Sequence, residues 1–541
     1  MHNSSCQYVY RRHAIVVAMA VVISGAVLHT LAAAPPSTRR PNIVFFILDD
    51  MQRYMFNCLP EGRGKNLTPT IDRLAAEGTL LLGQHVASPV CTPSRYNCLT
   101  GNYASRALEA QARNQGQTVV TWNTHIATHD DNLPKQLRQA GYTTGIVGKN
   151  HVLSVPGWKK IPYEADPTQP DARAQLKSNA AKVQAAFKQA GFDYVASIYH
   201  NNPDGNGAKA LAVHNLDWIA QGAVDFIDQN HERPFFLYFA STIPHGPGQP
   251  KRAWNADPRA TADGFLHEAP NVLPQRPTLP KRLREAGIKG WEKENMLWLD
   301  DAVGAVMKKL EEHGIADNTI VFFFNDHGQA AKGTLYQGGV TNPSIVWRKG
   351  GFPCGSVNRA LVSNIDFAPT ILDYAGAGIK RETFDGHSLK PLLEGQTQTV
   401  RESLYFEMGY TRAVRKGDWK YLALRYTEQA RKMPLAKRKQ ILERVNKNLL
   451  RRSKKVHSTN PEDRFSHISL VPGGGDAEHG SMGKYPAYYD NDQLYNLAED
   501  PKEQRNLARD PAYAEKLAEM KRELRGYLAK LPGGFGDLKT P

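Results

Sequence analysis

Cysteine is scarce in this chain, with five among 541 residues. So few thiols cannot build the disulfide framework of a small secreted scaffold. No spacing of cysteine and histidine matches a structural zinc site. Whether one disulfide forms among Cys58, Cys98 and Cys354 stays open at this point. A hydrophobic content of 41% over this length is enough for a large core and for more than one domain.

Long hydrophobic runs are also missing beyond the N-terminus. Arg11 and Arg12 precede the apolar stretch Ala14–Leu28, and small residues follow at 32–34. This pattern predicts a signal peptide over residues 1–34. The stretch is short for a membrane span, and an uncleaved anchor is the alternative. We expect an exported protein, periplasmic or secreted, with no stable membrane association after signal cleavage.

A phosphate-cradling motif and internal repeats are absent as well. The glycine-rich loop Pro472–Gly475 is not followed by the Gly-Lys-Ser/Thr that such a motif needs. The charge, in contrast, is strongly positive, at +15 for the whole chain. Residues 1–34 carry two arginines and no acid, so their removal leaves +13. This charge favours an anionic partner, which is nucleic acid, a membrane surface or a sulfated polymer.

Strand and helix patterns alternate along the first three quarters of the chain. Continuous apolar runs are typical of strands that are buried on both faces, and amphipathic segments bounded by proline and glycine are typical of helices. The predicted strands are Ile43–Leu48, Tyr142–Val147, Phe235–Ala240 and Thr319–Phe324, and the predicted helices are Thr68–Glu77, Leu133–Ala140, Ala174–Ala190 and Trp291–Glu312. This alternation predicts an α/β fold with a large, mainly parallel sheet between helices.

The pattern changes after about Gly395. Arg415–Leu422 alternates like an antiparallel strand, Gln493–Leu497 resembles a second strand, and Tyr513–Leu531 has apolar residues at helical spacing. We therefore expect a main α/β domain over residues 35–398 and a smaller C-terminal α+β subdomain over residues 399–541.

A strongly basic segment lies within this second part. Glu428–His457 contains eleven lysines and arginines and two glutamates, with a partial apolar face. One interpretation is a solvated helix on the surface. The other is a basic platform for a polyanionic substrate.

Each of the four predicted parallel strands ends in polar, reactive residues. In open α/β sheets, ligands bind outside the carboxyl ends of the strands, so these residues predict one shared site. Its carboxylate oxygens suit calcium or magnesium. The four groups are Asp49-Asp50, Lys149-Asn150-His151, Pro244-His245 and Asn325-Asp326-His327.

The pentapeptide Cys91-Thr92-Pro93-Ser94-Arg95 is the most specific motif. Proline is favoured at the first helical position, so a helix is predicted from about Pro93 through Leu99. Residue 91 would then lie at the positive end of the helix dipole, which is a favourable place for an anion. The pentapeptide resembles the signature of the type I sulfatases of the alkaline-phosphatase superfamily.

That resemblance implies a mechanism and a set of site residues. In the family, the cysteine is oxidised to formylglycine by a formylglycine-generating enzyme or an equivalent, and its hydrate attacks the sulfur of a sulfate ester. One divalent metal ion, usually calcium, is held by residues like Asp49, Asp50, Cys91, Asp326 and His327. The family often has asparagine at the position of His327, so magnesium and manganese stay open. The resemblance assigns the chemistry to Cys91, Arg95, Lys149, His151, His245 and Lys332.

The chain departs from the family pattern at a few positions. Asn150 stands where tryptophan is common, Gln337 where glutamate is common, and Thr341 where arginine is common. Loops over 103–130, 154–171, 197–209 and 249–284 are expected to shape the pocket. Tyr199, His200 and Asn202 are interpreted as solvent-facing loop residues or as sugar contacts.

The expected function is that of an exported sulfatase acting on a sulfated polysaccharide or oligosaccharide. Nucleic acid is not an expected partner. Two alternatives stay open: a phosphodiesterase or phosphonate monoester hydrolase of the same superfamily, and a non-catalytic binder of sulfated glycans.

Overall fold

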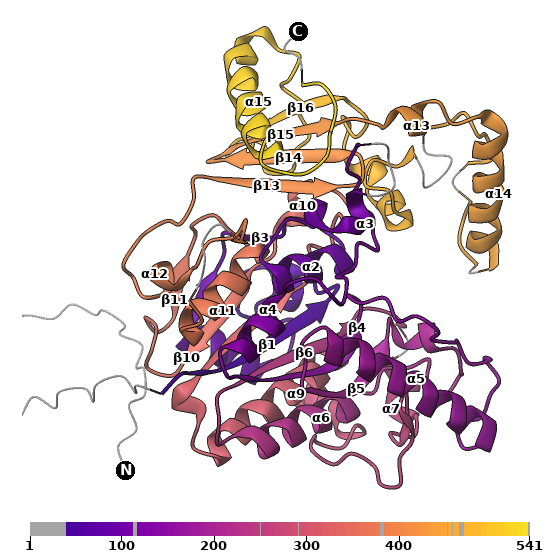
Figure 1. The fold of residues 1–541 in the computed structure, drawn as a ribbon, viewed down its shortest axis with the longest axis vertical. Coiled ribbons are helices and arrows are strands. Elements are labelled where there is room, and N and C mark those ends of the chain that lie inside the picture. The colour runs from indigo at the N-terminus through magenta and orange to yellow at the C-terminus, as the bar shows by residue number, and fades with distance from the viewer. Residues whose placement is uncertain are drawn as a thin grey trace, which may run out of the picture. The chain divides into compact units, whose positions relative to one another are not determined.

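The computed structural model describes residues 39–111, 116–248, 250–289, 292–378, 383–451, 453–456, 458–464 and 470–538 (Figure 1). All of them belong to one compact unit, Arg39–Pro541. The predicted signal peptide lies outside the described residues. Within the described part, no helix is long and apolar enough to cross a membrane.

The main sheet has eight strands in the order β11-β2-β10-β9-β1-β6-β4-β5. Five neighbouring strands, from β9 to β5, are parallel, and β10 is antiparallel to β9 and to β2. The strands are β1 (Asn42–Asp49), β2 (Thr79–Leu81), β4 (Thr143–Asn150), β5 (Tyr194–His200), β6 (Phe235–Pro244), β9 (Thr319–Asn325), β10 (Ser344–Arg348) and β11 (Ser356–Asn358). Two-stranded ladders add β3 (Gln84–His85) with β12 (Val362–Ser363) and β7 (Ala260–Thr261) with β8 (Gly264–Phe265).

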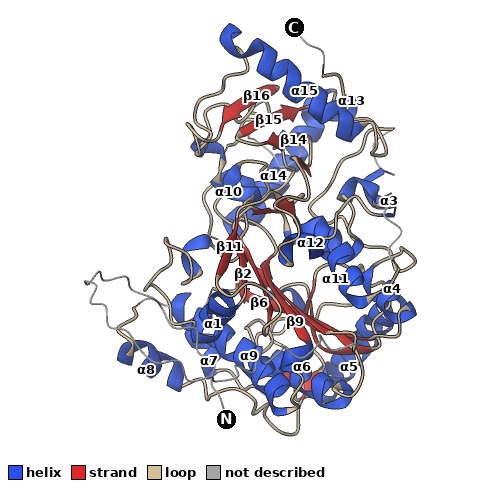
Figure 2. Cartoon of the chain, turned by 90° about the vertical axis from the view of Figure 1, so that its left-hand side faces the viewer, coloured by secondary structure: helices blue, strands red, loops and turns tan. Residues whose placement is uncertain are grey.

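Strand β1 lies in the middle of the sheet and is buried on both faces. Its side chains alternate, so that Ile43, Phe45 and Ile47 join one core cluster, and Val44, Phe46 and Leu48 join the other. Helices cover both faces, as Figure 2 shows. The helices of this part of the chain are α1 (Pro69–Glu77), α2 (Cys91–Thr100), α3 (Leu108–Gln111), α4 (Leu133–Gln139), α5 (Pro170–Gln189), α6 (Leu216–Asn230), α7 (Pro250–Asn255), α8 (Thr278–Glu285), α9 (Glu292–Glu312), α10 (Gln337–Val340), α11 (Phe367–Ala375) and α12 (Lys390–Leu393).

A separate antiparallel sheet follows toward the C-terminus, in the order β13-β14-β15-β16. Its elements are β13 (Ser403–Met408), β14 (Thr411–Lys416), β15 (Trp419–Leu424), α13 (Glu428–Arg431), α14 (Leu435–Arg451), β16 (Asp492–Asn496) and α15 (Ala514–Leu528). The predicted fold class is confirmed. The predicted boundary between residues 398 and 399 stays a prediction.

The prediction of a single strand over Arg415–Leu422 is wrong. This segment spans a hairpin, in which β14 ends at Lys416 and β15 begins at Trp419. Gly417, with a φ of 57°, makes the turn in the left-handed region that glycine tolerates without steric cost. The alternation of the segment is real, but it belongs to two paired strands.

The predicted loops are also partly ordered elements. Residues 197–209 include the end of β5, and residues 249–284 contain α7, β7, β8 and most of α8. Several strands were not predicted because they have only two or three residues, too few to show a period.

Buried polar contacts join the C-terminal sheet to the segment between β9 and β10. Lys420 on β15 donates to Glu503 at 2.7 Å, and both side chains are buried. The second carboxylate oxygen of Glu503 accepts from the backbone N–H of Gln337 at 2.6 Å. Tyr336 donates its hydroxyl to Gln493 on β16 at 2.8 Å. The C-terminal sheet is thus fixed to the segment that follows Lys332.

Candidate active site

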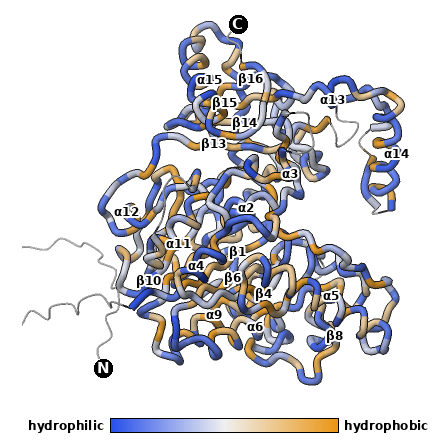
Figure 3. Tube along the Cα trace, in the orientation of Figure 1, coloured by the Kyte–Doolittle hydropathy of each residue, from blue (hydrophilic) through white to orange (hydrophobic). Residues whose placement is uncertain are grey.

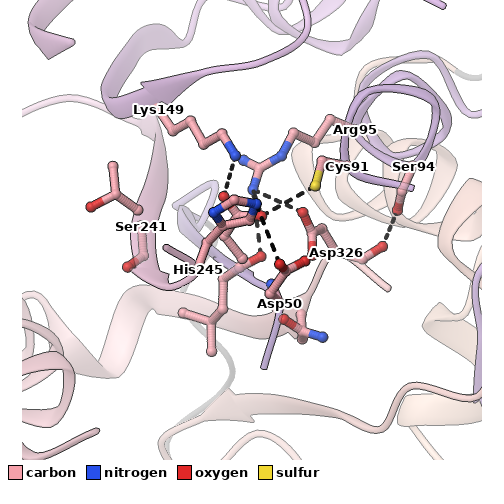
Figure 4. Close-up of polar contacts among 12 residues, drawn as sticks. Asp50, Cys91, Ser94, Arg95, Lys149, Ser241, His245 and Asp326 are labelled. Carbon is pink, nitrogen blue, oxygen red and sulfur yellow. Dashed lines mark hydrogen bonds and ion pairs between the residues drawn. The ribbon is translucent and has the colours of Figure 1, made fainter. Parts of the chain in front are cut away.

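The carboxyl ends of four adjacent strands, β9, β1, β6 and β4, form the site. Asp49 on β1 aligns with Pro244 on β6, and Leu48 on β1 aligns with Asn325 on β9. These registers place the residues after each strand side by side at one edge of the sheet. The shared site that the strand ends predicted is therefore present (Figure 4).

Two consecutive carboxylates leave β1 in the same direction. Asp49 is the last residue of the strand and is fully buried. Asp50 has a φ of 64°, a left-handed conformation that is uncommon for a residue with a Cβ. Successive side chains of a strand point to opposite faces, and this change of conformation lets both carboxylates face one point.

Cys91 enters the site from helix α2. The helix begins at Cys91 and not near Pro93, so the predicted start is two residues too late. Pro93 is tolerated in third place because the first N–H groups of a helix have no partner within it. The thiol donates to Asp49 Oδ1 at 3.3 Å and lies 3.4 Å from Nε2 of His327. Residue 91 therefore lies at the positive helix end, as predicted.

Three carboxylates face three cations in this site. Each pair joins residues from different elements, and most of the six side chains are buried. The charges balance, so an added divalent cation gives the site a net positive charge that suits an anionic substrate. The pairs are Asp49 with Lys149, Asp50 with Lys332 at 2.6 Å, and Asp326 with Arg95 at 3.2 Å.

These charges shift the acidity of the buried groups. Burial by itself would raise the pKa of Asp49, but the nearby cations, led by Lys149, outweigh it and hold that pKa well below its usual range. Burial and the carboxylates of Asp326 and Asp49 raise the pKa of the Cys91 thiol well above its usual value. Burial also raises the pKa of Asp326. Asp49 is thus held ionised at neutral pH, in the form that binds a cation.

Two histidines border the cluster. His245 follows β6 and places Nε2 at 3.3 Å from Asp50, with a side chain that is 21% exposed. His151 follows β4, and its Nδ1 is buried without a hydrogen-bond partner. Burial and the charge of Lys149 hold the pKa of His151 well below its usual value, so its ring is neutral at neutral pH. A neutral ring nitrogen can accept a proton from a bound group.

Arg95 has unused donors in the same place. It is 1% exposed, and it donates through Nη2 to Asp326. Its Nε and Nη1 atoms are buried and have no hydrogen-bond partner. Buried donors of this kind are costly unless something accepts from them, so these two atoms favour an additional oxygen acceptor at the site.

The ligand set fits a divalent cation. Asp49, Asp50, Cys91, Asp326 and His327 each offer one atom, and these atoms all lie within 4.8 Å of one another. Carboxylate oxygens and one imidazole suit a hard divalent ion. Among the described residues this is the one group of three or more such side chains that close together.

The supporting residues Ser94, Asn325 and Asn364 were not identified from the sequence as holding the site together. Asn325 accepts from the backbone N–H of Met51 at 2.8 Å, which fixes the turn after Asp50. Ser94 donates its hydroxyl to the backbone oxygen of Asp326, and Asn364 donates to Ser94 Oγ at 2.9 Å. These contacts join segments hundreds of residues apart, and only polar residues beside a motif could have pointed to them.

The interpretation of Tyr199 and His200 as solvent-facing loop residues is wrong. Tyr199 is fully buried on β5 and donates to the backbone oxygen of Val213 at 3.3 Å. His200 ends the same strand, and its Nδ1 lies 2.9 Å from the amide nitrogen of Asn150. Asn150 also accepts from Leu153 N–H at 3.1 Å, and so it fixes the turn that carries His151.

The described cysteines form no disulfide. Cys98 lies buried on α2, in the same helix as Cys91, and Cys58 is half-buried elsewhere. The open question of a disulfide among Cys58, Cys98 and Cys354 is therefore answered in the negative for this structure.

Known proteins are similar to this chain in sequence and in fold. A mouse N-acetylgalactosamine-6-sulfatase is 30% identical over 419 residues, covering 73% of each chain. An ulvan-active sulfatase from Formosa agariphila is 25% identical and covers 91% of this chain and 75% of its own. The solved structure of Ps i-CgsB in complex with k-i-k-neocarrahexaose superposes with a TM-score of 0.57 at 20% identity, covering 90% of this chain and 93% of that one.

The family model described as Sulfatase matches residues 41–377. The match spans β1 through α11, the part of the chain that carries the cluster of Asp49, Cys91 and Asp326. The resemblance to the type I sulfatases is thereby confirmed, and the chain belongs to the sulfatase family of sulfuric ester hydrolases.

Proposed function

We propose that this protein is an exported sulfatase that removes sulfate from a sulfated polysaccharide or oligosaccharide, with a formylglycine made from Cys91 and one calcium ion. The observation that carries the proposal is the position of Cys91. It lies at the first turn of a buried helix, against three carboxylates and a histidine. An unmodified thiol beside metal ligands would be a poor match for an oxygen-binding cation.

The cation is proposed to bind Asp49, Asp50, Asp326, His327 and residue 91. It supplies positive charge that polarises a sulfate oxygen and favours loss of a proton from a hydroxyl group of residue 91. Calcium is the ion we favour, since most of the ligand atoms are carboxylate oxygens.

The formylglycine hydrate supplies an oxygen nucleophile and a second hydroxyl, whose deprotonation allows sulfate to be expelled as the aldehyde forms again. Arg95 holds the hydrate through the Nε and Nη1 donors that lack partners in the site. His151 accepts the proton of the second hydroxyl at its buried Nδ1. A cysteine or serine has one nucleophilic atom and lacks this exit.

Lys149 and Lys332 bind the sulfuryl oxygens. Lys332 lies 3.6 Å from the sulfur of Cys91, so its ammonium group can reach a sulfate attached there. Positive groups fixed beforehand stabilise the charge that develops on these oxygens. His245, with a partly exposed ring at the rim, donates a proton to the leaving alcohol.

Support for a glycan substrate comes from the named relatives, which include an ulvan-active sulfatase and an N-acetylgalactosamine-6-sulfatase. The net charge of the chain adds to it, because a basic protein attracts a polyanion. The predicted signal peptide over residues 1–34 would deliver the enzyme to polymers outside the cytoplasm. A formylglycine-generating enzyme or an equivalent would convert Cys91 before the enzyme becomes active.

Sulfate release from carrageenan, ulvan, fucoidan, heparin and chondroitin sulfate fragments tests the proposal, with an aryl phosphate diester as the competing substrate. We expect release from at least one sulfated fragment and little cleavage of the diester. The reverse preference would contradict the proposed activity.

Mass spectrometry of the peptide that contains residue 91 tests the nucleophile. We expect the aldehyde in active protein, and we expect a C91S variant to be inactive or to retain covalent sulfate. Full turnover by C91S, or an unmodified cysteine in fully active protein, would refute the aldehyde mechanism.

A further inference from the structure

Helix α14 presents a row of basic side chains to solvent. Lys437, Arg444, Lys447 and Arg451 are exposed and follow one another at intervals of seven, three and four residues. These intervals place them on one side of a helix with 3.6 residues per turn. At 1.5 Å per residue, the row from Lys437 to Arg451 is ~21 Å long. Figure 3 shows a hydrophilic colour along much of α14.

The basic row has no acidic partners. Within the described ranges no ion pair joins Lys437, Arg444, Lys447 or Arg451 to a carboxylate. The neighbouring helix α13 differs, because its Glu428 pairs with Lys432 at 2.5 Å. Exposed cations without intramolecular partners repel one another and are available to an external anion.

The other side of α14 indicates what kind of anion fits. Ile441, Leu442 and Leu449 are buried, so most of the apolar face is already covered. Leu435 and Leu450, at opposite ends of the helix, are the exposed leucines of α14, which leaves little apolar surface to enter a lipid bilayer. The helix contains no aromatic residue on which a nucleic-acid base could stack. The exposed row therefore matches best a hydrated polyanion that has neither nucleic-acid bases nor acyl groups.

The segment that carries α13 and α14 begins and ends close to the candidate active site. Tyr426 donates to the backbone oxygen of Leu470 at 2.7 Å, which closes the segment that carries α13 and α14. Just after this segment, the backbone of Gly473 packs closely against Gly333, the neighbour of Lys332. A Cβ added to Gly473 would lie 2.0 Å from the backbone oxygen of Gly333. Trp122 donates to the backbone oxygen of Gly473 at 3.0 Å. The two ends of this segment therefore meet near Gly333, the neighbour of Lys332.

We propose that the row of Lys437, Arg444, Lys447 and Arg451 on α14 is a second binding site for the sulfated glycan chain, outside the catalytic pocket. The inference rests on the proposed function, since it takes the same polymer as the ligand. The row holds the sulfate groups of a distant part of the chain while one sulfate ester is hydrolysed. Long polymers therefore gain affinity over short fragments, without a change in the chemical step.

Binding to an immobilised sulfated polymer tests this without hydrolysis. The probe is full-length C91A protein on the fragment panel named above, with heparin as reference, at several NaCl concentrations. In the R444Q/K447Q/R451Q variant we expect roughly tenfold weaker binding. We also expect the slope of log K against log salt to fall by about 2, since each lost contact removes ~0.7 released counterions for a flexible polyanion. Glutamine keeps the helical propensity of the replaced residues.

A matched control is R173Q/K177Q/K188Q, which removes three exposed cations from α5 that, like those of the row, pair with no carboxylate within the described ranges. It changes the net charge equally but leaves the row intact, so we expect its affinity to stay within twofold of that of the parent. Equal weakening in both triple variants would show a general charge effect and would overturn the proposal.

Kinetics with Cys91 intact separate this site from the catalytic one. The R444Q/K447Q/R451Q variant should raise KM for the polymer roughly tenfold and leave kcat, and both constants for a small aryl sulfate, unchanged. Unchanged polymer KM would refute the second site while the proposed activity stands. If the wild-type protein releases no sulfate, the proposed activity is refuted. If that protein still binds the polymer through the row, the binding site stays supported. Tighter row-dependent binding to RNA or to anionic lipid vesicles than to the sulfated polymers would overturn the choice of ligand.

Discussion

The buried ion pair between Lys420 and Glu503 gives a sharp test of how the C-terminal sheet is attached. In K420M, a linear apolar side chain of similar length replaces the cation. Glu503 then keeps one hydrogen bond, from the N–H of Gln337, and loses its only ion-pair partner in the described structure. Both side chains of the wild-type pair are at most 1% exposed, so solvent cannot replace the lost partner.

The expected cost follows from this burial. Burial raises the pKa of Glu503 and lowers the pKa of Lys420, and the attraction of each partner offsets the shift only in part. The pair as a whole therefore stabilises the fold little, but the removal of one partner leaves a buried charge. We expect K420M to lose about 3–5 kcal/mol of unfolding free energy, and the double variant K420M/E503Q to recover most of it.

Urea unfolding followed by tryptophan fluorescence measures these differences, provided that the m-value stays constant between variants. K516M is the matched control, because Lys516 pairs with Glu519 at 2.5 Å on a surface where both side chains are about one-third exposed. Its expected cost is below about 1 kcal/mol. A similarly small cost for K420M, or a double variant less stable than K420M, would refute the reasoning.

Three further predictions concern the site. K149M should lower kcat on an aryl sulfate about 10²–10³-fold, because a fixed cation on the sulfuryl oxygens is lost; an unchanged kcat would place Lys149 outside the chemistry. N364A should lower kcat by roughly tenfold with an unchanged KM, since Ser94 loses the donor that orients it beside Asp326; a change confined to KM would argue against this role. Treatment with EGTA should abolish activity and lower the melting temperature, and calcium should restore both, as binding to the folded state requires. Activity that survives complete chelation would exclude the metal.

Much of the fold was predictable because the central strands have a clear sequence pattern. Two of these strands are short, continuous apolar runs, Ile43–Leu48 and Thr319–Phe324. Such runs are typical of a strand that is buried on both faces. Strand β5 was missed because Tyr194–His200 mixes buried and half-buried residues at the edge of the sheet, where alternation is weak. Helix α6 was also missed, although its N-cap Asn215 accepts from the N–H of Trp218 as a cap should.

The candidate site was predictable to the extent that sheet topology places strand ends together. Asp49, His245 and Asp326 needed only the rule that parallel strands end at one edge. The same rule placed Asn325 at this edge, but not its contact with the backbone of Met51. Asn364 could not be found in this way, because its contacts with the backbone of Ala87 and with the Ser94 hydroxyl depend on the full three-dimensional path of the chain. Their roles in positioning stay predictions, as do the catalytic assignments.

Strand β1 lies between β9 and β6, and each of the three ends in residues of the site. The side chains of the site are therefore spaced by the hydrogen-bond ladder of the sheet, whose neighbouring strands lie ~4.8 Å apart. Insertion of one residue within β1 would turn Asp49 toward the opposite face. Beyond His245 and beyond the turn that carries His151, the segments after β6 and between β4 and α5 are not part of this ladder and can change in length. A descendant of this protein can therefore acquire a new sulfate ester substrate through its loops while it keeps the same chemistry.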